Sequence, residues 1–217
     1  RTMKNWIRLA AVLALCCFSA ASHAVDVDVD GIINAAVIEH QEKYPAPASE
    51  AAWNRMLDNL YAAGGLWKYL QLVPRFKVAS RDGSIVVLEP STIQGSVHEL
   101  PAYRGYRAFA WLGAVQCDRL PFRFPGRGVL LFKYETLDNQ ADQVIFKIFL
   151  RGRGLVPDLA LKLLAPWIEP ALAYKAGWIM RYELPVMSRE IREHPQRMRR
   201  LLDAAGYEKE FIRLPGT

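Results

Sequence analysis

The chain has 217 residues, of which 52% are hydrophobic and 23% are charged, and its formal net charge is +6. This length accommodates one domain with a substantial core and is too short for two well-packed domains. Arg1, Lys4 and Arg8 supply three of the positive charges, so the rest of the chain is only mildly basic. The charge therefore argues against a nucleic-acid-binding protein.

The N-terminal residues have the pattern of a secretory signal peptide. A basic start containing Lys4 and Arg8 precedes an apolar run over residues 9–18, and Ser22-His23-Ala24 follows. The run is much shorter than the roughly 20 residues that span a bilayer, and small residues stand where a signal peptidase requires them. We expect residues 1–24 to be removed after Ala24, which leaves residues 25–217 as one domain in the periplasm or outside the cell.

Cysteine usage fits this interpretation. Cys16 and Cys17 lie in the apolar run and leave with it, so Cys117 has no intramolecular disulfide partner. The residues before Cys16 and Cys17 are not the small residues that lipidation requires. Cys117 has two interpretations, a small buried hydrophobe or a nucleophile.

The first predicted elements of the mature chain are helical. Residues 31–40 favour a brief helix before the proline-rich residues 44–47. Ser49 is suited to cap a longer helix, and Gly64-Gly65 is expected to end it. The apolar positions that recur in this helix at helical spacing are Trp53, Met56, Leu57, Leu60 and Tyr61.

The middle of the chain has the pattern of strands. Asp82-Gly83 between two β-rich runs indicates a tight hairpin. Turn residues separate the other runs, so we expect an antiparallel meander of about six strands. The predicted strands cover residues 76–79, 85–89, 91–99, 103–115, 128–137 and 143–151.

The C-terminal part returns to helical spacing over residues 159–167, 170–180 and 187–205, with breaks expected at Pro166, Pro170 and Pro185. Strands followed by helices indicate the α+β class. We therefore expect a curved antiparallel sheet with an N-terminal helix and C-terminal helices laid on one face.

Catalytic and metal-binding motifs are sparse. His40, His98 and His194 do not stand at metal-binding spacings, and phosphate loops, dinucleotide fingerprints and nucleophile elbows are missing from the sequence. His98 and Glu99 are adjacent in a predicted strand, so they should point to opposite faces. We expect neither a metal nor a cofactor, and we favour a protein that is not an enzyme.

Basic and aromatic residues mix through residues 103–134. This mixture suits an anionic amphiphile, with arginine at the headgroup and aromatic rings along the tail. It also suits nucleic acid, which an exported protein rarely meets, or an ordinary sheet with an aromatic core face and a basic outer face. Several strands are apolar on both faces, which predicts cover on both sides, either a cavity or the N-terminal helix filling that space. The basic residues are Arg104, Arg107, Arg119, Arg123, Arg127 and Lys133, and the aromatic ones are Tyr103, Tyr106, Phe109, Trp111, Phe122, Phe124, Phe132 and Tyr134.

A family resemblance follows from the order of elements. Residues 51–57 open a helix, the meander occupies residues 76–151, and a long helical region begins after Gly154. This order, over roughly residues 49–205, resembles the START-related helix-grip superfamily of hydrophobic-ligand-binding proteins. The resemblance implies a sheet gripping a helix around an apolar cavity, with a lipid, a sterol or another apolar small molecule as cargo. In that superfamily the closing helix is usually one long element, whereas the prolines predict breaks here.

The sequence thus leads to three functional hypotheses. The first is a monomeric exported carrier of a lipid or other amphiphile, which contacts anionic membranes at its basic last helix and does not bind nucleic acid. The second is a small exported enzyme acting on a lipid or sugar through Cys117 or His98, and the third is an envelope adaptor or structural protein. For the carrier, the predicted ligand-binding residues are Trp53, Leu57, Arg104, Arg107, Phe109, Trp111, Phe132, Phe146 and Trp178.

Overall fold

A computed structural model of the chain describes residues 27–73, 77–81, 84–89, 93–116, 123–137, 141–194 and 196. The fold is α+β, as the sequence predicts. The helices are α2 (Val29–Asn34), α3 (Glu50–Asp58), α4 (Leu60–Tyr69), α5 (Leu155–Trp178), the π-helix η1 (Ile179–Glu183) and α6 (Leu184–Glu193). The strands are β1 (Ile38–Pro45), β2 (Lys77–Arg81), β3 (Ser84–Glu89), β4 (Ile93–Tyr103), β5 (Tyr106–Gln116), β6 (Arg123–Glu135) and β7 (Gln143–Gly152).

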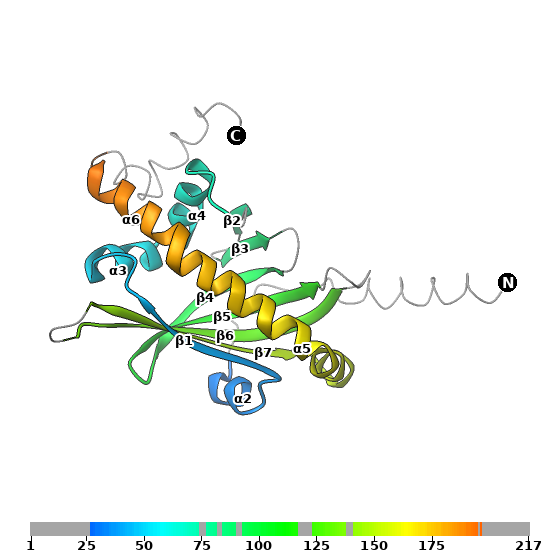
Figure 1. The fold of residues 1–217 in the computed structure, drawn as a ribbon. Coiled ribbons are helices and arrows are strands. Elements are labelled where there is room, and N and C mark those ends of the chain that lie inside the picture. Colours follow the sequence, from blue (N-terminus) through cyan, green and yellow to red (C-terminus); the bar gives the residue numbers. More distant parts are fainter. Residues whose placement is uncertain are drawn as a thin grey trace.

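The strands form one antiparallel sheet in the order β1-β7-β6-β5-β4-β3-β2 (Figure 1). The predicted six-strand meander is confirmed as β2 to β7, and β1 adds a seventh strand at the far edge. β2 and β3 pair from Arg81 and Ser84 outward, so the predicted hairpin is present. Its turn, Asp82-Gly83, lies outside the described residues.

The helix predicted over residues 31–40 is wrong for its second half. α2 ends at Asn34, and Ile38 already begins β1, which pairs with β7 from Ile38 and Leu150 to Pro45 and Gln143. Ile38 and Tyr44 are buried on the inner side of β1, but the inward positions between them are His40 and Glu42. These two polar residues remove the apolar alternation by which a strand is normally identified.

The glycine pair does not end the first long helix. The chain leaves helical geometry at Asn59, where φ is −139° and ψ is 76°, and α4 then continues through Gly64 and Gly65. Glycine costs about 1 kcal/mol in a helix interior. Directly after the pair, Leu66 and Trp67 are 0% and 6% exposed, and their burial offsets this cost.

The breaks predicted at Pro166 and Pro170 are wrong, whereas the α-helix is interrupted just before Pro185 by η1. α5 runs from Leu155 to Trp178 with Pro166 and Pro170 inside it, and Figure 1 shows its first turns at an angle to the rod that η1 and α6 continue across the sheet. Both prolines lie on the outward face, where carbonyls freed of their helical partners can meet water. Pro185 lies in the first turn of α6, directly after the π-helical turn η1, so the change of helical hydrogen-bonding pattern coincides with the residue that lacks an N–H.

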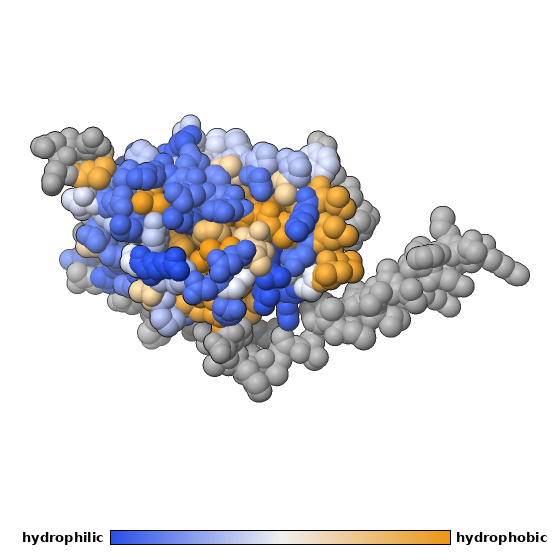
Figure 2. Space-filling view, turned by 90° about the horizontal axis from the view of Figure 1, so that it is seen from below, coloured by the Kyte–Doolittle hydropathy of each residue, from blue (hydrophilic) through white to orange (hydrophobic). Residues whose placement is uncertain are grey.

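Helices cover the sheet on both sides. α5 packs over β1, β7 and β6, and the face of the sheet that it crosses is called the inner face here. On the outer face, Ile32 of α2 packs against Val129, Leu131 and Phe149, which makes a smaller second core. Figure 2 views the molecule from below, the side on which α2 lies, and shows hydrophobic residues in orange among hydrophilic ones in blue. No helix within the described ranges has the length and apolar character needed to cross a membrane.

Candidate functional site

Most of the predicted lining residues meet on the inner face. Phe132 lies at the centre, with ring centroids at 5.9 Å from Trp53, 5.9 Å from Phe109 and 5.1 Å from Phe146. Leu57 of α3 is buried in the same core as these rings. The strand register explains this gathering, because Phe132 and Phe146 are directly paired across β6 and β7, and Phe109, which pairs with Leu130, lies diagonally opposite Phe132 on the same face. We call Trp53, Leu57, Phe109, Phe132 and Phe146 the aromatic cluster.

Trp111 lies on the inner face of the sheet toward β4, and its ring packs over two glycines, Gly95 and Gly126. A Cβ added to Gly95 would come within 2.4 Å of Trp111 Nε1, and one added to Gly126 within 3.1 Å of its ring. The indole is 5% exposed, and its buried Nε1 has no hydrogen-bond partner among the described residues. An unsatisfied buried donor costs about 1–3 kcal/mol. The inner face therefore offers a hydrogen bond that the protein does not use itself.

Arg107 connects the sheet to α3 rather than facing an open site. Its guanidinium donates to Asp58 Oδ1 at 2.6 Å, to Glu99 Oε1 at 2.5 Å and to the Asn54 carbonyl at 3.2 Å. Burial lowers the pKa of Arg107, but the hydrogen bonds to the two carboxylates outweigh it and leave the pKa above its ordinary value. Two carboxylates thus already neutralise the cation that the sequence assigns to a headgroup.

Arg104 and Trp178 lie away from the aromatic cluster. Arg104 stands in the β4–β5 turn at φ 50°, next to Gly105, and ion-pairs with Asp30 of α2 at 3.4 Å. It therefore belongs with the helix that covers the outer face. Trp178 is 38% exposed on the outward side of α5, so its ring does not lie between helix and sheet. The ligand-binding roles predicted for these two residues remain predictions, and their positions do not favour them.

A polar group that the sequence did not single out joins β1 to η1. Glu42 accepts hydrogen bonds from Tyr44 at 2.8 Å and from Arg181 at 3.0 Å, and His40 Nε2 lies 3.6 Å from Glu42 Oε2. Burial and the hydrogen bond to Glu42 raise the pKa of Tyr44 well above its ordinary range. Arg181 also stands over the Tyr44 ring, at 5.7 Å from its centroid. The group fixes the C-terminal end of the long helix against the edge strand.

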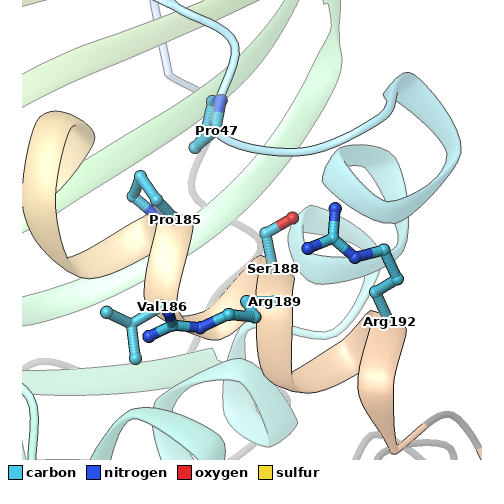
Figure 3. A pocket seen from close by; sticks show the side chains of 6 residues that line it. All are labelled: Pro47, Pro185, Val186, Ser188, Arg189 and Arg192. Carbon is cyan, nitrogen blue, oxygen red and sulfur yellow. The ribbon is translucent and has the colours of Figure 1, made fainter.

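A surface pocket of about 410 Å³ opens where α6 passes the loop between β1 and α3. Figure 3 shows its six lining side chains, which are Pro47, Pro185, Val186, Ser188, Arg189 and Arg192. Pro47, Pro185 and Val186 form apolar walls, and Val186 also packs against the main core. No ion pair joins Arg189 or Arg192 to any residue in the part of the chain that the structure describes. The pocket therefore combines apolar walls that continue into the core with two positive charges that have no ion-pair partner among the described residues.

The residues named for the enzyme hypothesis gain no support. His98 Nε2 lies 3.3 Å from Ser96 Oγ, while Glu99 points to the opposite face and binds Arg107. The two side chains thus diverge as expected, and His98 has no carboxylate contact within the described ranges. Cys117 lies outside the described residues. Over the described ranges, histidine, cysteine and acidic side chains do not gather in any group of three or more that could hold a metal ion.

Comparisons with known proteins add little. No protein-family model matches the chain, and no curated protein sequence matches it. Among solved structures, the chain is similar to a protein from Thermobifida fusca determined by solution NMR, with 11% sequence identity and a TM-score of 0.31. The match covers 58% of this chain and 80% of the other.

Proposed function

We propose that the protein binds an acidic amphiphile, such as a fatty acid or lipid, between the inner face of its sheet and helices α3 and α5. The observation that carries this proposal is an aromatic inner face together with a pocket lined by two arginines that form no ion pair within the described ranges. The apolar tail would insert among the rings of the aromatic cluster and replace some of the contacts that these rings make with each other. The acidic headgroup would pair with Arg189 and Arg192.

The arrangement of elements supports the proposal. One strand, a pair of helices, a six-strand meander and a long helix laid across the sheet follow one another along the chain. We propose that the chain is a helix-grip protein related to the START superfamily, as its element order suggests. α5, η1 and α6 follow one another without an intervening loop, which supports the comparison with one long closing helix, although the π-helix η1 divides them.

The tail would bind by burial of apolar surface. Transfer of such surface from water contributes roughly 25 cal/mol per Å², before the costs of ordering the ligand and the site. The rings of the aromatic cluster contact each other, so a tail must move some of them to enter. α3 is the natural part to move, because a few side chains hold it to the sheet, chiefly Trp53 against Phe132 and Arg107 on Asp58.

The headgroup would bind at the pocket of Figure 3. Figure 3 shows the side chains of Arg189 and Arg192 extending to opposite sides of Ser188, so both would turn inward to form charge-assisted hydrogen bonds with a carboxylate or phosphate. Ser188 would add a hydroxyl donor between them. Arg107 and Arg104 are less suited to this role, since carboxylates already pair with both. The proposed headgroup site thus moves from the sheet to α6.

A fluorescence titration with a dansylated fatty acid tests this function. The probe should bind with one site per chain, and its neutral methyl ester should bind more weakly. The double substitution Arg189→Ala/Arg192→Ala should weaken the acid by at least about tenfold and the ester little, because each charge-assisted bond contributes about 1.5–3 kcal/mol. Arg153→Ala removes an exposed cation elsewhere and serves as the matched control.

Two results would contradict the proposal. One is a failure of the probe to bind to protein from which bound lipid has been extracted. The other is an equal loss of acid and ester in the double variant, which would remove the headgroup role from α6.

A further inference from the structure

The outward face of α5 and η1 carries a row of large apolar side chains. From Leu159 onward they recur every four or seven residues, which keeps them on one side of a helix. Leu163, Trp167, Tyr174 and Tyr182 are 67%, 54%, 70% and 58% exposed. We call the whole row the outer stripe, and it consists of Leu155, Val156, Leu159, Leu163, Trp167, Tyr174, Trp178 and Tyr182.

The C-terminal half of the outer stripe is an ordered row of rings. The centroids of Tyr174 and Trp178 are 6.3 Å apart, and those of Trp178 and Tyr182 are 4.7 Å apart. Trp178 Nε1 donates to Glu183 Oε1 at 2.7 Å, and Glu183 is itself buried. The protein therefore fixes an indole ring at its surface, although burying that ring would stabilise the fold. Contiguous exposed apolar surface of this kind marks a contact with a partner or a membrane.

The charges along this face have one sign. The exposed charged residues between Arg153 and Tyr182 are Arg153, Lys162 and Arg181, all of them basic. Arg181 pairs with Glu42 at 3.0 Å, so Arg153 and Lys162 supply the positive charge of this face.

The acidic residues of the same span, Asp158 and Glu169, are less exposed, and Asp158 pairs with Arg151 at 3.0 Å. Glu183, which follows the span, is buried and binds Trp178. The face thus presents apolar and aromatic side chains flanked by positive charge.

We propose that the outer stripe docks on a membrane surface that contains anionic lipids. Tryptophan and tyrosine favour the membrane interface, aliphatic side chains enter the acyl boundary, and flanking lysine and arginine attract anionic headgroups. The positive flanks give this surface charge complementarity to such a membrane. The inference extends the proposed function, because a lipid carrier must reach a membrane, but docking requires no bound cargo.

Vesicle flotation tests the inference with the protein in the form its producing cell accumulates. One set of vesicles is phosphatidylcholine, and the other is an equal mixture of phosphatidylcholine and phosphatidylglycerol. The triple substitution Leu163→Ser/Trp167→Ser/Tyr174→Ser should reduce binding to the mixed vesicles by at least about tenfold, because it removes most of the buried apolar area. Val73→Ser changes another exposed apolar residue away from the stripe and should bind like the unchanged protein.

A charge variant separates electrostatic from apolar attraction. Lys162→Glu should weaken binding to the mixed vesicles by roughly fivefold or more and leave binding to phosphatidylcholine alone unchanged. Tryptophan fluorescence should shift to the blue with the mixed vesicles in the unchanged protein and shift less in the triple variant, which lacks Trp167. The triple variant should still take up the dansylated fatty acid, so loss of docking and loss of the ligand site are distinguishable.

Three outcomes would overturn the inference. The triple variant floats as well as the unchanged protein, which would place docking elsewhere. The unchanged protein stays off both kinds of vesicle and remains monomeric. In the third outcome, the unchanged protein binds neither kind of vesicle but self-associates, and the triple variant does not self-associate. The outer stripe would then be an interface between copies of the chain.

Discussion

Arg107 on β5 donates to Asp58 on α3 at 2.6 Å, and this ion pair joins the sheet to the helix that carries Trp53. The same guanidinium reaches Glu99 on β4, so one side chain links three elements. We interpret Arg107 as the residue that holds α3 closed over the aromatic cluster.

Arg107→Ala should therefore loosen α3 without abolishing the fold. The free energy of unfolding should fall by about 1–2 kcal/mol, since both carboxylates are half exposed and can return to water. Hydrogen exchange in α3 should accelerate more than exchange in β6. Affinities for the acidic probe and its methyl ester should change by the same factor. A loss confined to the acid would instead make Arg107 the headgroup residue that the sequence first suggested.

Trp111→Phe tests whether the unused indole N–H serves a ligand. A fatty acid with a hydroxyl along its chain should bind the unchanged protein up to about tenfold tighter than its plain analogue, since one buried hydrogen bond contributes about 0.5–1.5 kcal/mol. The variant should remove this difference. Phe132→Leu, which changes the cluster without changing a donor, should weaken both acids equally. If the preference survived in Trp111→Phe, the donor would lie elsewhere.

Gly128→Ala should destabilise the sheet. A Cβ at this position would come within 2.4 Å of Leu150 Cδ2 and 2.7 Å of the Phe149 carbonyl oxygen, and the backbone atom cannot move without disturbing β7. Overpacking of this kind costs about 1–3 kcal/mol in urea unfolding. Gly177→Ala is the matched control, because its nearest neighbour, Tyr44 Cε1, lies 3.9 Å away. In α5 it should be neutral or stabilising by up to about 1 kcal/mol.

Tyr134 should make the stability of the fold depend on pH in the alkaline range. Its hydroxyl donates to Asp142 at 2.7 Å and to the Ala48 carbonyl at 3.1 Å. Burial, together with the hydrogen bond to Asp142, raises the pKa of Tyr134 from 10.0 to about 12. The folded state thus favours the protonated phenol, so this stabilisation is complete below pH 10 and is lost as the pH rises from 10 toward 12.

Tyr134→Phe should accordingly flatten the fall of unfolding free energy over that interval. Absorbance titration of the phenolate should also lose one transition near pH 12 in the variant. Tyr44, whose pKa is also raised, should continue to titrate late in both proteins. If the unfolding free energy of Tyr134→Phe fell over this pH interval as steeply as that of the unchanged protein, deprotonation of Tyr134 would not be the cause of the fall.

The meander and the aromatic cluster were predictable because they depend on local alternation. Phe109, Phe132 and Phe146 each stand in strongly β-like runs, so the sequence predicts their strands, and the observed pairing then shows that these positions share the inner face. The class α+β followed from the same runs. The hairpin at residues 82–83 was predictable from its turn residues alone.

The edge strand and the pocket were not predictable in the same way. β1 carries His40 and Glu42 inward, and their partner Arg181 lies far along the chain, so the pairing depends on tertiary structure. Pro166 and Pro170 interrupt a helix in the sequence but not in the fold, because solvent takes up the freed carbonyls. In the sequence, Arg189 and Arg192 have the pattern of an ordinary solvent-exposed helix face. Only the tertiary structure brings Pro47 to them and forms the pocket.

Native mass spectrometry of the protein purified from its producing cell, followed by organic extraction and lipid analysis, tests the central claim most directly. We predict one acidic amphiphile per chain, lost on extraction and regained when the protein meets the extracted lipid again. A protein that carries no adduct as purified and takes up no lipid when offered the cell's own extract would contradict the account.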